Sequence, residues 1–144
     1  MKKCIYFLSV LAFVFSFALI APMAIAKDMT ADDLVTEAKE SICEVSVSDA
    51  KALLDKGENV FLDCREPKEF KMGHVPGAIN IPRGLLEFKI SKKIPDKNAN
   101  VVMYCKKGGR GCLATCCLCR MGYRNVKNLA GGWMGWEKAG YPIE

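Results

Sequence analysis

The segment CKKGGRGC, at residues 105–112, places a thiol beside cations and glycines. Cys105 is followed in order by Lys106, Lys107, Gly108, Gly109, Arg110 and Gly111. Glycines let successive backbone amides turn toward one point, and such amides together with cationic side chains bind anions and favour a thiolate over a thiol. The segment therefore predicts a nucleophilic cysteine in a loop that also binds an anionic substrate, with no metal or other cofactor.

The flanking sequence predicts how this thiol is positioned. Residues 100–104, NVVMY, are typical of a buried strand, and residues 111–121 are typical of a helix that ends at Gly122. The positive end of that helix would point at Cys105. A cysteine after a strand is often only a small buried side chain, but the combination of strand, thiol, basic glycine-rich loop and helix favours a reactive one.

The remaining elements alternate at short spacing. We expect further strands at 45–47, 59–63, 78–81 and 125–129, and helices at 30–41, 49–56, 85–90 and 132–139. This alternation predicts an α/β domain with a mainly parallel sheet, whose sites form at the carboxyl ends of strands. Asp63 and Arg65 follow one strand and Cys105 another. We expect Asp63 and Arg65 to form a structural ion pair that supports neighbouring loops.

The first 26 residues differ from the rest of the chain. Lys2 and Lys3 precede an apolar run at 5–20, Pro22 follows, and Ala-Ile-Ala ends at residue 26. This pattern predicts a signal peptide at 1–26 and export to the periplasm. After cleavage, we expect the remaining chain to have no contact with the membrane. The alternative is an uncleaved membrane anchor. We expect a helical lead-in at 27–43 and one domain at 44–144.

Charge and cysteine content narrow the function classes. The net charge of +5 comes without a basic run interleaved with aromatic residues, so we expect no nucleic-acid partner. Of eight cysteines, Cys4 would leave with the signal peptide, and the odd remainder implies at least one unpaired thiol in a monomer. The helix after the loop carries an unusual group, Cys112, Cys116, Cys117 and Cys119. Its spacing fits no common zinc site, so we expect apolar packing against the sheet.

Two chemistries use a cysteine in an anion-binding loop. The tyrosine-phosphatase signature needs five residues between cysteine and arginine, whereas four separate Cys105 from Arg110. The shorter loop instead resembles that of the rhodanese (sulfurtransferase) family. VFLDCREPKEF at 60–70, GHVPGAINIP at 73–82 and NLAGGWMGWEKAGYPIE at 128–144 resemble further elements of this family, so the resemblance spans about residues 45–144. It implies a rhodanese-like fold, with a five-stranded, mostly parallel sheet and helices on both faces.

The resemblance also implies a reaction. Cys105 would take the outer sulfur of thiosulfate or a similar anionic donor, hold it as a persulfide, and pass it to cyanide or a thiol. Residues 106–111 would bind the donor, and Arg110 would brace the loop through Asp63 or another acid. His74, Trp133 and Trp136 are expected to be structural.

Two alternatives stay open. The protein could be a sulfur carrier that serves a protein partner, or a thiol-redox protein that uses Cys105 with Cys112 or Cys64. The sequence does not assign roles to Cys43, Cys64 or the four helix cysteines, and we expect a monomer.

Overall fold

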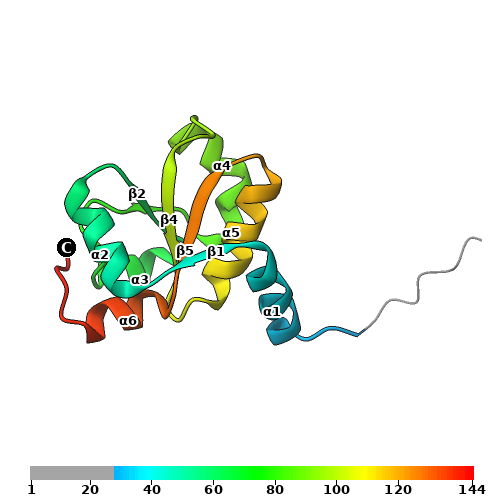
Figure 1. Cartoon of the computed structure of the whole chain (residues 1–144), viewed down its shortest axis with the longest axis horizontal. Coiled ribbons are helices and arrows are strands. Elements are labelled where there is room, and N and C mark those ends of the chain that lie inside the picture. The colour runs from blue at the N-terminus through cyan, green and yellow to red at the C-terminus, as the bar shows by residue number, and fades with distance from the viewer. Residues whose placement is uncertain (1–27) are drawn as a thin grey trace, which may run out of the picture.

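The computed structural model describes residues 28–144, which form an α/β domain around one sheet (Figure 1). The predicted signal peptide lies outside the described residues. The five strands are β1 (Cys43–Val45), β2 (Val60–Asp63), β3 (Ile79–Asn80), β4 (Asn100–Tyr104) and β5 (Asn125–Leu129). Their order is β1-β5-β4-β2-β3, and all four neighbouring pairs are parallel. The predicted fold class is confirmed.

Helices cover both faces of the sheet (Figure 1). They are α1 (Ala31–Ser41), α2 (Val47–Lys56), α3 (Pro67–Lys71), α4 (Leu86–Lys93), α5 (Gly109–Arg120) and α6 (Gly132–Lys138), with a 3₁₀ turn at Arg83–Leu85. One apolar core joins the sheet to α4 and α5, and the other joins it to α2 and α6. Alternate residues of β4 serve the two cores, with Val101 and Met103 in the first and Val102 and Tyr104 in the second.

Capping residues set several boundaries that the sequence patterns missed. Ser46 accepts a hydrogen bond from the Asp49 amide, so α2 begins at Val47 and the strand predicted at 45–47 ends at Val45. The short helix α3 was not predicted, and it begins after Glu66 with Pro67 in its first position. Helix α5 begins at Gly109, two residues before the predicted start, which brings its positive end nearer to Cys105.

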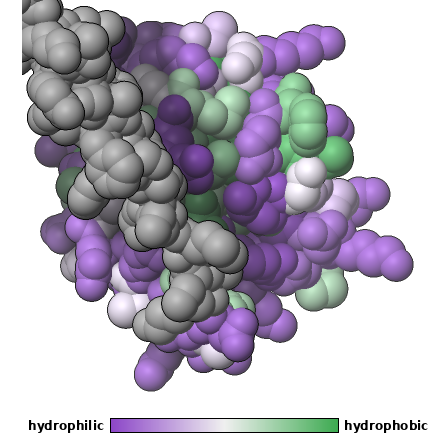
Figure 2. All heavy atoms as spheres, turned by 90° about the vertical axis from the view of Figure 1, so that its right-hand side faces the viewer, coloured by the Kyte–Doolittle hydropathy of each residue, from purple (hydrophilic) through white to green (hydrophobic). Residues whose placement is uncertain are grey.

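The first helix is an addition on the outside of the layered domain. Thr30 and Asp33 form a reciprocal capping box at its start, and the helix packs against α5. Figure 2 shows this side of the molecule, where polar side chains predominate and apolar ones gather in small patches. Among residues 28–144, no helix combines the length and the apolar character needed to cross a membrane.

Candidate active site

The site lies at the carboxyl ends of the two central strands. Strands β2 and β4 pair in register, with Asp63 opposite Tyr104, so Cys64 and Cys105 each follow directly at the same edge. Both side chains are buried, with Cys64 fully enclosed and Cys105 2% exposed. Asp63 and Arg65, at the end of β2, therefore lie at the same sheet edge as the Cys105 thiol, as predicted.

We call residues 105–111 the active loop. Gly108 has a φ of +104°, a conformation that favours glycine, and its amide donates a hydrogen bond of 3.2 Å to Cys105 Sγ. The hydrogen bond from Cys64, followed by those from the amides of Gly111, Gly108 and Lys107, lowers the pKa of Cys105 from 9.0 to about 5 against the opposing effect of burial. These surroundings favour the thiolate of Cys105, which is the nucleophilic form of a cysteine.

Close packing fixes the course of the active loop. A Cβ atom at Gly111 would overlap the amide oxygen of Asn128, and one at Gly132 would overlap the carbonyl oxygen of Cys105. The start of α6 also holds the loop, because the Trp133 amide donates to the Cys105 carbonyl at 2.7 Å and the Met134 amide donates to the Lys106 carbonyl at 3.0 Å. The amides that face the sulfur are thus set in place before any substrate binds.

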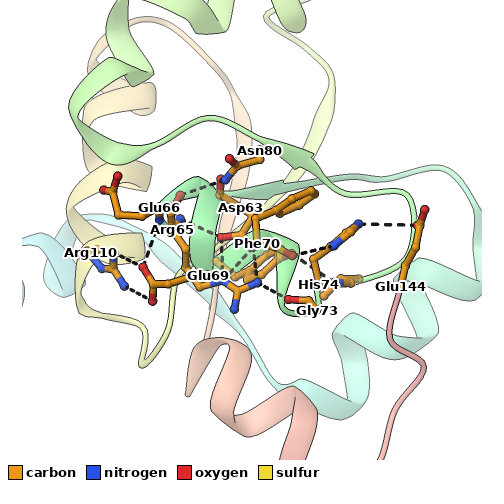
Figure 3. A network of polar contacts seen from close by, with 12 residues as sticks. Asp63, Arg65, Glu66, Glu69, Phe70, Gly73, His74, Asn80, Arg110 and Glu144 are labelled. Carbon is orange, nitrogen blue, oxygen red and sulfur yellow. Dashed lines mark hydrogen bonds and ion pairs between the residues drawn. The ribbon is translucent and has the colours of Figure 1, made fainter.

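Arg110 braces the loop through Glu69. Its two terminal nitrogens each donate to one carboxylate oxygen of Glu69 at 3.1 Å, which ties the start of α5 to α3 (Figure 3). The expected alternative through Asp63 is wrong, because Asp63 accepts from the Arg65 side chain at 2.7 Å. Glu69 was not identified from the sequence as the partner of Arg110. The only available signal was its place as the third residue of helix α3, which was itself not predicted.

Asp63 and Arg65 form a buried ion pair, as expected. Asp63 also accepts the backbone amide of Arg65 at 2.8 Å, and Arg65 donates to the Gly73 carbonyl at 2.7 Å. The guanidinium lies 4.6 Å from the ring centre of Trp133. With its hydrogen bonds satisfied in this way, the pair links the end of β2 to the loop after α3 (Figure 3). The contact between Arg65 and Trp133 extends this link to α6.

The lysines of the active loop face solvent. Lys106 and Lys107 are both exposed, so their positive charges are accessible from solvent. A pocket of about 300 Å³ opens beside Lys106 and extends to Arg65, Glu69 and Trp133. Cys105 itself is almost enclosed and does not line this pocket, which meets the active loop at Lys106.

His74 and Trp136 have structural contacts. His74 stacks on Phe70 with ring centres 3.6 Å apart, its Nδ1 lies 3.1 Å from the Phe70 carbonyl, and its Nε2 lies 3.8 Å from the Glu144 carboxylate. Trp136 is fully buried and donates to the Pro142 carbonyl at 2.9 Å. These contacts hold the 73–77 segment and the C-terminal residues.

The other cysteines have different surroundings. The predicted packing against the sheet fits Cys112, which is buried and accepts from the Asn128 side-chain amide at 3.1 Å. It is wrong for Cys119, which is exposed. Cys117 donates to Glu87 at 3.0 Å. Within residues 28–144, no group of three or more side chains is arranged to hold a metal ion.

Comparison with known proteins points to one family. The model of the rhodanese-like domain matches residues 46–139. The chain is 37% identical over 110 residues to thiosulfate sulfurtransferase 16 of Arabidopsis thaliana, covering 69% of this chain and 91% of that protein. It is 37% identical over 98 residues to a sulfurtransferase of Allochromatium vinosum, covering 68% and 90%.

A solved structure from Rhodopseudomonas palustris, of a protein of unknown function described as a possible tyrosine phosphatase, superposes with a TM-score of 0.77 at 32% identity. The match covers 85% of this chain and 99% of that one.

Proposed function

This chain belongs to the rhodanese-like domain family, and we propose that it is a sulfurtransferase that moves a sulfane sulfur from thiosulfate, or a similar anion, through a persulfide on Cys105. The observation that carries the proposal is the Cys105 sulfur at the focus of the active loop, where the Gly108 amide donates to it. Relatives named as sulfurtransferases support the same activity class.

The first half-reaction uses the thiolate that the loop stabilises. Cys105 Sγ attacks the outer sulfur of thiosulfate, a sulfur–sulfur bond forms, and the bond to the sulfonate sulfur breaks with release of sulfite. The negative charge then lies on the outer sulfur of the persulfide. The amides of Lys107, Gly108 and Gly111, which favour the thiolate, also face this charge.

The second half-reaction returns Cys105 to its starting state. Cyanide attacks the outer sulfur and leaves as thiocyanate, or a thiol takes the same atom as its own persulfide. Arg110 is engaged by Glu69 and 38% exposed, so its place in this scheme is to hold the loop and add positive charge.

Phosphatase chemistry is disfavoured by the length of the loop. Four residues separate Cys105 from Arg110, one fewer than the phosphatase signature needs, and Gly111 occupies the position where that signature has arginine. A loop this tight suits a single sulfur atom better than a phosphate group. We also propose that the chain is exported, on the strength of residues 1–26 alone.

Turnover of thiosulfate and cyanide by the reduced full chain tests the proposal. We expect thiocyanate from the wild-type chain, none from Cys105→Ser, and wild-type rates from Cys119→Ser, whose exposed thiol is a matched control. A sulfur carrier would load from thiosulfate but turn over cyanide slowly. Absence of thiocyanate together with oxidation of Cys105 would instead favour the thiol-redox alternative.

A further inference from the structure

The carboxyl ends of β2 and β4 place two cysteines side by side. Cys64 and Cys105 are each one residue beyond the registered pair Asp63 and Tyr104, and the Cys64 amide still donates to the Tyr104 carbonyl at 2.9 Å. Neighbouring strands lie about 4.8 Å apart. Disulfides join residues whose Cα atoms are about 4.4–6.8 Å apart. The backbone therefore already has a spacing that a Cys64–Cys105 bond requires.

The two side chains also share one face of the sheet. Both belong to the core between the sheet and the helices α4 and α5, and the Cys64 thiol is the largest influence that lowers the pKa of Cys105. Cys64 is fully buried, so a sulfur acceptor in solution cannot reach its thiol. Cys112, the alternative partner considered from the sequence, is engaged by Asn128 and lies 3.6 Å from Glu44.

We propose that Cys64 is a second catalytic cysteine, which discharges the Cys105 persulfide as hydrogen sulfide. The proposal rests on the proposed function, since it needs a persulfide on Cys105. Cys64 Sγ attacks Cys105 Sγ, a Cys64–Cys105 disulfide forms, and the bond to the outer sulfur breaks. The two cysteines are oxidised, the sulfane sulfur is reduced to sulfide, and the Cys64 proton ends on that sulfide.

The surroundings of Cys105 favour this direction of attack. The amides of the active loop face the sulfur from the loop side and would hold the outer sulfur there, whereas Cys64 approaches from the neighbouring strand. Before loading, the neighbouring Cys105 sulfur and burial raise the pKa of Cys64, so Cys64 is a thiol. After loading, the negative charge lies one atom further out, and the Cys64 proton passes to that outer sulfur as Cys64 Sγ attacks Cys105 Sγ.

The cycle then needs a reductant of defined chemistry. A dithiol, or two monothiols, would reduce the disulfide and restore both cysteines. The acceptor class is thus a thiol reductant, and the net reaction turns thiosulfate and a dithiol into sulfite, sulfide and a disulfide. Cyanide would compete with Cys64 for the same loaded enzyme.

A single-turnover experiment tests the proposal. The reduced full chain is loaded with thiosulfate without oxygen, thiol or cyanide, the excess donor is removed, and sulfide and peptide masses are followed. We expect about one sulfide per loaded chain and a disulfide between the Cys64 and Cys105 peptides, neither of which forms in an unloaded control.

Variants separate the chemical role of Cys64 from its support of the thiolate. Cys64→Ser keeps a hydroxyl donor beside Cys105 and a similar volume, so it should load sulfur and retain it without releasing sulfide. Cys112→Ser should release sulfide as the wild-type chain does.

Each other result has a defined meaning. A wild-type persulfide as lasting as that of Cys64→Ser, or a disulfide that omits Cys64, would overturn the inference and leave the proposed function standing. Failure of the wild-type chain to take up any sulfur would overturn the proposed function itself. Because sulfide and the disulfide are measured on the wild-type chain, the test does not depend on the folding of a variant.

Discussion

The hydrogen bond from Cys64 is the largest cause of the lowered Cys105 pKa, so Cys64→Val should raise that pKa. Valine fills a similar space in the core but has no donor. A hydrogen bond to a charged group contributes about 1.5–3 kcal/mol. At about 1.4 kcal/mol per pKa unit, its loss should raise the pKa of Cys105 by about 1–2 units.

The assay is the rate at which iodoacetamide alkylates Cys105, measured by peptide mass across pH 4–9. Alkylation needs the thiolate, so the rate falls as pH drops through the pKa. For the wild-type chain we expect a midpoint near the value of about 5. The Cys64→Val midpoint should lie near 6–7, and its rate at pH 5 should be roughly 5- to 50-fold lower.

Two controls sharpen this experiment. Cys64→Ser should keep a midpoint close to that of the wild-type chain, because its hydroxyl can still donate. Cys117→Ser alters a thiol that contacts Glu87 and should change nothing. An unchanged midpoint in Cys64→Val would refute the claim that Cys64 stabilises the thiolate, and the amides would then have to account for it alone.

Three further predictions follow from the loop and the N-terminal segment. Glu69→Gln should raise the KM for thiosulfate several-fold. It should cost under about 1 kcal/mol of unfolding free energy, because Arg110 is partly exposed. Full activity of Arg110→Ala in steady-state kinetics would contradict the bracing role. Gly111→Ala should cost about 1–3 kcal/mol in denaturant unfolding, because its Cβ would overlap Asn128. Gly84→Ala, with open space around its Cβ, is the matched control, and equal stabilities would contradict the packing argument. N-terminal sequencing of the chain recovered from the periplasm should begin at Lys27, and a chain that retains residues 1–26 would show that they are not cleaved.

The sequence predicted the parts of the fold that local patterns control. The strands at 100–104 and 125–129 have the predicted bounds, because each is a run of suitable residues between turn or loop residues. Helix starts were less accurate where a cap competes with the periodic pattern, as at Ser46 and Gly108. Helix α3 has only five residues, too few for a periodic signal.

The parts of the site that the sequence missed depend on contacts between distant residues. Arg110 could be identified as a loop cation, but its partner Glu69 lies 41 residues earlier. Cys64 and Cys105 were each noticed, yet their contact requires that β2 and β4 be neighbours, and strand order is a property of the whole sheet. A reactive residue at the end of a strand is therefore easier to predict from sequence than the side chain that contacts it in the folded protein.

The most direct test of the central claim is to find where sulfur is added. The reduced wild-type chain is exposed briefly to thiosulfate, quenched early with an alkylating reagent, and mapped by peptide mass. We predict one additional sulfur on the peptide that contains Cys105, accompanied by an equivalent of sulfite. Sulfur on another cysteine, or on none, would contradict the assignment of Cys105 as the sulfur-accepting nucleophile.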